Sequence, residues 1–503
     1  MLSSMQSITS LFVRPDAVAL LARLHTFLIA QKIETYLVGG YIRDGFLGRS
    51  NHDIDLAVNA DAIQVARQVA DAFDARFVLL DEVHQIARVV LVHDEDRWYI
   101  DFATIRGSIE DDLRKRDFTV DAIAMKLEHL AAGWNRVDLI DPLDGVGDLE
   151  RKLIRVASDS AFLDDPARLM RAFRLATELD FSIDSRTEGL IQRDNGAIIS
   201  VSGERIREEL GRILETKNAT NSIRHLDQLG LLTLLIPELS VSKGVEQPKE
   251  HYWNVFEHSI ETVAAVERLL MALNSKEEGL LDSLSYREVL VEHFDEVIGG
   301  GLTRRSLVKL AALIHDVAKP QTKAIHENGK MRFLGHAQQG AKIAEGILER
   351  LRFSTREKRI VTGMIDQHLR PGHLSNAPEL PTRRAIYRYF RDTGDIGIDT
   401  LFLSLADHLA TRGPTFEMAG WLEHVEVTEY MLNKRIEDAD TVLPPKLVSG
   451  HTLIERFGLE PGPEIGRLLE AVREAQASGE IMSEQDALDF VGKELSTNNA
   501  NQR

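Results

Sequence analysis

The stretch LVGGYIRDGFLGRSNHDIDLAV, residues 37–58, decides how the first part of the chain folds. Two adjacent glycines, Gly39 and Gly40, follow one apolar run, and Asp53 and Asp55 open a second one. Side chains alternate along a strand, so the two aspartates share one face and the apolar residues take the other, toward the core. Two carboxylates on one face repel each other. The pattern therefore predicts a cation between them.

Magnesium suits this pair, because it prefers oxygen ligands and is commonly held by one or two carboxylates together with substrate phosphates. Gly39 and Gly40 lie between the expected strand and a helix, where glycine lets phosphate oxygens approach backbone N–H groups. Arg43 follows and is suited to bind a triphosphate. A lone Asp-x-Asp is more often a surface turn. The combination of the glycines, the arginine and both aspartates favours a nucleotide site.

A third carboxylate, Asp101 in WYIDFAT, shares its strand face with Tyr99 and Ala103. An aspartate in an apolar run needs a partner. Two interpretations stay open: Asp101 flanks the aspartate pair as a base or extra metal ligand, or it faces water from an edge strand.

Composition limits the class of protein. A chain of 503 residues exceeds one core, so two to four domains are expected. The hydrophobic fraction of 44% and charged fraction of 28% are typical of globular proteins. The chain has no cysteine, which excludes disulfides and thiolate metal sites and leaves Asp, Glu and His as metal ligands.

The sequence gives no sign of export. The start, MLSSMQSITS, lacks a basic segment before a long apolar run, so no signal peptide is expected. No run of about 18 apolar residues exists, so no membrane span is expected. The prediction is a cytoplasmic enzyme. The net charge of -19 disfavours nucleic-acid binding by the chain as a whole, although local basic patches decide binding.

Hydrophobic patterning divides the chain into four parts. The first mixes strands with helices and predicts a small α/β domain. The second and third are helical, and the third holds most of the histidines; the last contains two amphipathic helices separated by a Gly/Pro turn. The strands are expected at residues 35–38, 54–58, 76–80, 88–92 and 98–103. The domains are expected at residues 1–157, 158–245, 246–412 and 413–503.

Two segments are expected to lack regular structure. Residues 274–305 are rich in acids and contain three consecutive glycines, which favours an inserted loop with a hinge. The polar end, residues 496–503, has the composition of a disordered tail.

Five stretches, in order along residues 36–214, carry a family resemblance. They are LVGGYIRDGFLGRSNHDIDLAV, LRKRDFTVDAIAM, DPLDGVGDLERKLIRVA, DDPARLMRAFRLATELDF and GERIREEL, and they resemble the motifs of the class II tRNA nucleotidyltransferases. That family comprises CCA-adding enzymes and bacterial poly(A) polymerases. SGHTLIERFGLEPGPEIGRLLEAV resembles the family's tail region. The resemblance implies an α+β fold, with a polymerase-β-like nucleotidyltransferase head followed by an all-α neck, an HD domain and a tail.

The resemblance also implies residue roles. Asp53 and Asp55 match the family's Mg²⁺ ligands, and Asp101 is the further catalytic candidate. Two metals would activate the RNA 3′-OH and stabilise the leaving pyrophosphate. The nucleotide-binding candidates are Gly39, Gly40, Arg43, Arg116, Asp165, Arg168, Arg171 and Arg174.

The last four of these repeat every third residue and are expected to form one stripe on a helix. A solvated basic face is one interpretation. In the resembling family, an Asp and an Arg here pair with the edge of the incoming base. Asp165 would accept a hydrogen bond from N4 of cytosine or N6 of adenine, and Arg168 would donate one to the adjacent ring nitrogen or carbonyl. Only C and A present this pattern. The chain departs from the family at Asp164, where Glu is usual, and at Asp121, where Asn is common.

A second set of motifs lies in the third part. NVFEHSIET, LIHDVAKP, FLGHAQQGA and SLADHLA resemble the HD-superfamily phosphohydrolase pattern. Such ligands suit Ni²⁺, Co²⁺, Mn²⁺ or Fe²⁺ and activate bound water. A relict, purely structural site is the competing interpretation, and His368 or His373 would extend an active site to two metals. The candidate ligands are His258, His315, Asp316, His336 and Asp407.

The implied function is template-independent addition of C and A to the tRNA 3′ end from CTP and ATP, with no membrane partner. Only FATIRGSIED separates Asp101 from DLRKRDF, and a short loop there resembles CC-adding relatives. Poly(A) synthesis, phosphate hydrolysis at the HD motifs and RNA binding without catalysis also stay open. The sequence does not determine the oligomeric state. A local basic cleft for RNA is expected from Arg114, Lys115, Arg116, Arg151, Lys152, Arg155, Arg205, Arg207 and Arg212.

Overall fold

The computed structural model describes residues 15–93, 96–131, 138–275, 279–325, 329–377, 379–438 and 444–501, together with residues 327 and 442. The N-terminal stretch that bears on export lies outside these residues. The chain forms two compact units. One comprises Met1–Val201 with Leu229–Leu231, and the other comprises Ser202–Gln228 with Leu232–Arg503.

The first unit is built on a seven-stranded mixed sheet with strand order β3-β4-β5-β2-β1-β6-β7. Five of these are the strands expected from the sequence; β1 has the expected bounds, and the other four extend by one or two residues at one or both ends. Short strand-like runs were therefore sufficient to find them. The strands are β1 Thr35–Val38, β2 Asp53–Val58, β3 Arg76–Asp81, β4 Ile86–His93, β5 Asp96–Thr104, β6 Ala124–Lys126 and β7 Leu139–Ile140.

The alternation in β2 has the expected result. Ile54, Leu56 and Val58 are buried, whereas Asp53 is exposed and Asp55 is half-buried. β2 pairs with β1 in the antiparallel sense and with β5 in the parallel sense. The two aspartates therefore lie in the middle of the sheet.

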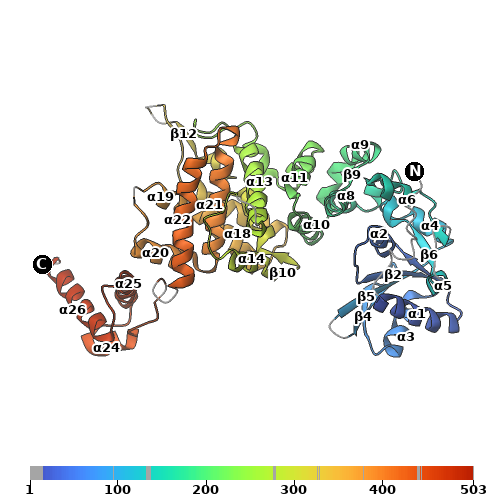
Figure 1. Ribbon diagram of the computed structural model, residues 1–503, viewed down its shortest axis with the longest axis horizontal. Helices are drawn as coiled ribbons and strands as arrows, with labels where there is room; N and C mark the ends of the chain where they lie inside the picture. The colour runs from blue at the N-terminus through green and yellow to red at the C-terminus, as the bar shows by residue number, and fades with distance from the viewer. Residues whose placement is uncertain are drawn as a thin grey trace. The chain divides into compact units, whose positions relative to one another are not determined.

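Helices cover the sheet and extend beyond it. α3 carries its apolar face, including Val65, Ala66 and Val69, onto β4 and β5 (Figure 1). The short β8 Leu153–Ile154 and β9 Ser182–Ile183 pair in the parallel sense. The helices are α1 Pro15–Ala30, α2 Gly40–Phe46, α3 Ala62–Ala72, α4 Ile109–Arg114, α5 Leu127–Ala131, α6 Gly145–Arg151, α7 Ala161–Asp164, α8 Arg168–Leu179 and α9 Ser185–Asp194, with a 3-10 turn η2 at Thr119–Asp121.

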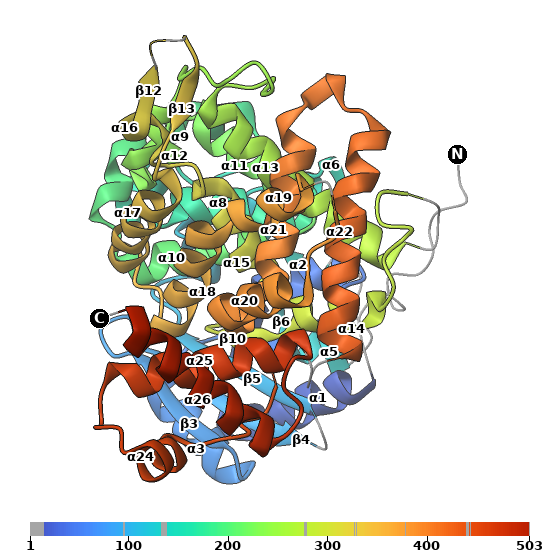
Figure 2. The same ribbon diagram turned by 90° about the vertical axis from the view of Figure 1, so that its left-hand side faces the viewer.

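The second unit is helical. Its centre is formed by α13, α15, α18 and α21, which pack on one another, and α22 runs beside α21 in both views (Figures 1 and 2). The helices are α10 Gly203–Glu215, α11 Ala219–Gln228, α12 Leu232–Leu235, α13 Val255–Asn274, α14 Arg287–Asp295, α15 Arg304–Ile314, α16 Lys319–Thr322, α17 His336–Arg350, α18 Thr355–Gln367, α19 Leu369–Ser375, α20 Arg383–Thr393, α21 Gly397–Thr411, α22 Met418–Glu437, α24 Gly450–Phe457, α25 Pro463–Ser478 and α26 Glu484–Asn501.

Two expectations about irregular segments are wrong. Within residues 274–305 lie α14 and a hairpin of β10 Val297–Gly299 with β11 Leu302–Thr303. Leu290 and Phe294 are fully buried and anchor α14, although three of its nine residues are acids. The polar C-terminal end continues α26 to Asn501. No helix among the described residues is long and apolar enough to cross a membrane.

Candidate active site

A row of charged side chains crosses the middle of the sheet in the first unit. Asp55 on β2 is in register with Asp101 on β5, and Asp101 is in register with Arg88 on β4. On the other side, Asp55 is in register with Val38, the last residue of β1. Asp101 thus belongs to an interior strand, and the interpretation that it faces water from an edge strand is wrong.

The environment of Asp55 opposes its negative charge. Burial raises the pKa of Asp55 to about 6, and the carboxylates of Asp101 and Asp121 add to the rise, while Arg116 opposes it. A carboxylate that is costly to ionise and has carboxylate neighbours favours a cation at its oxygens. The residues present therefore fit a divalent metal, with Asp53 on the same face as the second ligand.

The Gly39 turn brings β1 close to these side chains. Gly39 has φ 73° and ψ -137°, a backbone conformation that side-chain-bearing residues rarely adopt. A Cβ at this position would lie 2.8 Å from Nη1 of Arg116 and 3.2 Å from Oδ2 of Asp55. Only glycine allows this approach. The turn thus gathers Gly39, Arg116 and Asp55 around one point.

Arg43 on α2 is held between two carboxylates. Its Nε donates to Asp44 at 2.9 Å, and its Nη1 donates to Asp121 at 2.5 Å. Its side chain is largely buried and lies against Gly40. Arg116 donates to the backbone oxygen of Asp121 at 3.4 Å. The structure therefore brings together Gly39, Gly40, Arg43 and Arg116 beside Asp55.

Asp101 is bound by Arg88, a residue that the sequence motifs do not single out. Nε and Nη2 of Arg88 donate to the two carboxylate oxygens of Asp101 at 2.6 and 2.8 Å. Arg88 also lies 5.1 Å from the ring centre of Tyr99. A single cation in the apolar run IARVVLV was the available signal. An arginine pair of this kind is strong, so any role of Asp101 as base or ligand competes with Arg88.

The expected stripe of four residues begins only at Arg168. Asp165 lies before α8 in an extended conformation, with φ -147° and ψ 100°, because the following residue is Pro166. The expectation that Asp165 lies on the helix is therefore wrong. Arg168 donates to the backbone oxygens of Ala161 and Lys115 at 3.4 and 3.3 Å, which ties the start of α8 to the segment that carries Arg116.

Two more arginines of α8 have carboxylate partners. Arg171 pairs with Asp117 at 2.9 Å. Asp117 is buried, which opposes its ionisation, but Arg171, a backbone N–H, Arg168 and Arg116 outweigh burial and hold its pKa below the usual value. Arg174 is buried and pairs with Glu178 one turn further along α8. The structure thus groups Arg168 and Arg171 around Asp117, and Arg174 pairs elsewhere.

Some of the basic residues expected to contact RNA are engaged in ion pairs. Arg151 and Arg155 both bind the buried Asp148, at 2.7 and 2.6 Å. Arg207 donates to the backbone oxygen of Arg352 at 2.7 Å. Asp148 therefore balances part of the charge of Arg151 and Arg155, whereas the bond of Arg207 is to a backbone oxygen and not to a carboxylate.

The second unit holds a buried cluster of histidines and aspartates. His258 on α13 bonds to Asp407 on α21 at 2.9 Å, and His315, at the end of α15, lies 3.1 Å from Asp316. His336 on α17 lies 3.4 Å from Asp316. All five expected residues thus meet in one place, although they are spread over about 150 residues of chain.

The tautomers of this cluster suit metal binding. Nδ1 of His315 lies 2.8 Å from the backbone oxygen of Ala312, and Nδ1 of His336 and His368 each make the same contact at 2.6 Å with the residue three positions earlier. Donation from Nδ1 leaves Nε2 with a free lone pair facing the cluster. Both oxygens of Asp316 and Nε2 of His315 and His336 are buried without a hydrogen bond, although Nζ of Lys319 lies 2.6 Å from Oδ2 of Asp316. Imidazole and carboxylate groups gathered in this way fit a divalent metal.

Two groups of possible ligand atoms can be defined among the described residues, and both lie in this cluster. One is His258, His315 and Asp407, and the other adds His368 to His315 and Asp316. His368 is therefore brought in, whereas His373 belongs to neither group. Asp101 does not form such a three-ligand group with Asp53 and Asp55, consistent with its pairing to Arg88.

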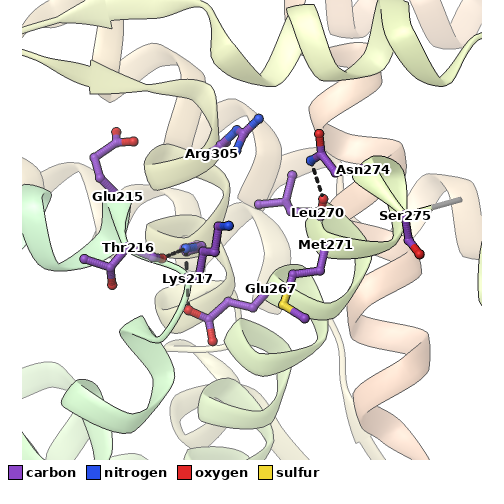
Figure 3. Close-up of a pocket in the computed structure, with 10 residues that line it drawn as sticks. Glu215, Thr216, Lys217, Glu267, Leu270, Met271, Asn274, Ser275 and Arg305 are labelled. Carbon is purple, nitrogen blue, oxygen red and sulfur yellow. Dashed lines mark hydrogen bonds and ion pairs between the residues drawn. The ribbon is translucent and has the colours of Figure 1, made fainter. Parts of the chain in front are cut away.

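A separate cavity of about 440 Å³ lies between the turn after α10, α13 and α15. In Figure 3, Leu270 and Met271 of α13 form one side, facing the turn of Thr216 and Lys217. Lys309 of α15 is buried and donates to the backbone oxygen of Leu214 at 2.9 Å. It neutralises the carbonyl end of α10, as basic residues do at helix ends. Glu267 of α13 lies 3.5 Å from Nζ of Lys309, so Lys309 connects α10, α13 and α15.

Three regions of the chain match known protein families. Residues 35–155 match the "Poly A polymerase head domain", residues 180–242 the "Probable RNA and SrmB- binding site of polymerase A", and residues 255–412 the "HD domain".

Curated relatives match nearly the whole chain. The A-adding tRNA nucleotidyltransferase of Deinococcus radiodurans is 32% identical over 90% of this chain and 94% of its own length. The CC-adding tRNA nucleotidyltransferase of Thermus thermophilus is 31% identical over 91% of this chain and 93% of its own. Among solved structures, a CCA-adding enzyme in apo form I has a TM-score of 0.64 at 22% identity, covering 97% of this chain and 96% of its own. The Thermotoga maritima CCA-adding enzyme in complex with tRNA has a TM-score of 0.61 at 23% identity, covering 97% and 98%. The fold is that of the CCA-adding enzymes.

Proposed function

The chain belongs to the tRNA nucleotidyltransferase family, and on that premise we propose that it adds C and A to the 3′ end of tRNA from CTP and ATP. The observation that carries this is the site in the first unit. Asp53 and Asp55 share one face of β2, and Arg43 and Arg116 meet beside Asp55 at the Gly39 turn. Carboxylates for a metal next to arginines for a triphosphate are the groups that nucleotidyl transfer requires. The cytoplasm is the proposed compartment.

Each residue has a defined task. Asp53 and Asp55 hold the divalent ion, and Mg²⁺ is proposed because all the ligands are oxygens. The ion supplies activation of the 3′-OH and charge stabilisation when bound. Arg43 and Arg116 bind the triphosphate, and the missing side chain of Gly39 leaves room for its approach. Asp101 stays a candidate base, restrained by Arg88.

Asp165 and Arg168 are proposed to select the base. The extended backbone at Asp165 and the two backbone contacts of Arg168 fix both residues at the start of α8. A carboxylate accepts from the exocyclic amine of cytosine or adenine, while uracil and guanine present oxygen acceptors instead. A pair of protein side chains that binds the edge of the base in this way admits C and A without a nucleic-acid template.

How many nucleotides are added depends on more than this site. The connection from β5 to α4 consists of only four residues, 105–108. A connection of this length leaves little chain to rearrange between CTP and ATP, which favours addition of CC alone as the main variant of the proposal. Named relatives include both A-adding and CC-adding enzymes.

One experiment separates these outcomes. A tRNA transcript lacking its CCA end is incubated with CTP and ATP together, and the product is sequenced. A CCA end supports the full activity, a CC end supports the CC-adding variant, and a long A tail supports poly(A) synthesis. A second transcript ending in CC tests for addition of A alone. Absence of added nucleotide on both transcripts would refute the proposal.

A second activity is supported by a separate observation. The buried histidine and aspartate cluster of the second unit leaves several ligand atoms without hydrogen bonds. Imidazole ligands favour a transition metal such as Ni²⁺, Co²⁺, Mn²⁺ or Fe²⁺ over Mg²⁺. A phosphohydrolase activity is the corresponding function, and release of phosphate from phosphomonoesters or opening of cyclic phosphates in the presence of each metal tests it.

A further inference from the structure

Asp121 contacts both arginines of the nucleotide site. It ends the 3-10 turn η2 and is 4% exposed. Its carboxylate accepts from Nη1 of Arg43 at 2.5 Å, and its backbone oxygen accepts from Nη1 of Arg116 at 3.4 Å. One buried residue therefore connects two basic side chains, one from α2 and one from the segment that follows α4.

The contacts leave Arg43 little freedom. Nε of Arg43 donates to Asp44 at 2.9 Å, and Asp44 in turn accepts from Asn51 at 2.7 Å. An arginine side chain in solution has many rotamers, and binding a phosphate would have to freeze them. Arg43 is already fixed before any ligand arrives. Prior fixation lowers the entropic cost of binding.

Stability alone does not explain Asp121. Its second oxygen, Oδ2, is buried without a hydrogen bond among the described residues, which is unfavourable for folding. A buried carboxylate that leaves one oxygen without a hydrogen bond while it holds Arg43 is explained by its effect on that arginine.

We propose that Asp121 is a positioning residue that holds Arg43, and through its backbone oxygen Arg116, in the orientation that receives the nucleotide triphosphate. It touches neither substrate nor metal and acts through the arginines. This rests on the proposed function, since it assigns the triphosphate to the Arg43 side of the site.

The test compares Asp121→Ala, Asp121→Asn, Arg43→Ala and the double variant Arg43→Ala with Asp121→Ala. Asp121→Ala is expected to raise the KM for CTP about tenfold or more, the effect of losing a hydrogen bond to a charged group, with the KM for tRNA within about twofold. Asp121→Asn keeps an oxygen acceptor and is expected to recover the KM to within about threefold. The double variant is expected to be no worse than Arg43→Ala, because residues that act as a unit are not additive.

A matched control is Asp81→Asn, an exposed aspartate of the same unit paired with His84, which should leave both KM values unchanged. The inference is overturned if Asp121→Ala keeps the wild-type KM for CTP, if Asp121→Asn fails to recover it, or if the double variant multiplies the two single effects. A fall in melting temperature with an unchanged KM would show a structural role only and would equally overturn it. If the wild-type protein adds no nucleotide, the proposed function fails first. The inference is then tested by the affinity for a non-hydrolysable CTP analogue, with the same variants and the same expected order.

Discussion

Replacing Asp55 with asparagine is expected to stabilise the metal-free protein while abolishing nucleotide addition. Burial, with the carboxylates of Asp101 and Asp121, raises the pKa of Asp55 from 3.8 to about 6 in the folded state. Because the folded pKa exceeds the unfolded one, ionising Asp55 destabilises the fold. The penalty is absent below about pH 4, grows between pH 4 and 6, and is complete above about pH 6. Two pKa units at ~1.36 kcal/mol each give about 3 kcal/mol.

Asparagine resembles the neutral acid, so the variant should gain up to about 3 kcal/mol at pH 7.5 and nothing at pH 4. The measurement is urea unfolding in EDTA, followed by pulsed hydrogen exchange of peptides from β2 and β5, so that the helical unit does not contribute. Asp53→Asn on the same strand is the matched control: its side chain is exposed, and its stability should change by less than about 0.5 kcal/mol. Mg²⁺ should stabilise the wild type and not Asp55→Asn. A variant no more stable than the wild type at pH 7.5, or equally stabilised at pH 4, would refute the reasoning.

Three other outcomes are expected. Asp53→Ala should abolish nucleotide addition with an unchanged circular dichroism spectrum, because an exposed ligand contributes little packing; near-normal incorporation would remove it from the metal site. Arg168→Ala should weaken the preference for CTP over UTP by about 5- to 150-fold with much less effect on tRNA binding, and an unchanged preference would contradict its role. His315→Ala combined with Asp316→Ala should leave nucleotide addition nearly intact while removing the bound transition metal, measured by elemental analysis, and any phosphatase or cyclic-phosphodiesterase activity. A folded double variant that loses nucleotide addition would make the helical unit part of the polymerising machinery.

Features with a strict local period were predictable. The five strands followed from short strand-like runs, and the polar face shared by Asp53 and Asp55 followed from the alternation of side chains along a strand. The turn at Gly39 needed a backbone conformation that only glycine adopts readily. The extended backbone of Asp165 was equally available from Pro166, since the residue before a proline avoids the helical region. Composition misled where it was used alone: the acids of α14 concealed the two buried apolar residues that anchor it.

The sequence by itself determined which residues are candidates for the chemistry, because residue type and short-range spacing are written along the chain. Only the tertiary structure decided their partners. Arg88 meets Asp101 through the register of β4 on β5, Arg43 meets Asp121 across 78 positions, and His258 meets Asp407 across 149. Such pairs depend on strand order and helix packing, which no local period encodes. Burial and nearby charges act on a side chain only after the chain has folded. The raised pKa of Asp55, the fixed orientation of Arg43 and the pairing of Asp101 with Arg88 therefore depend on the tertiary structure.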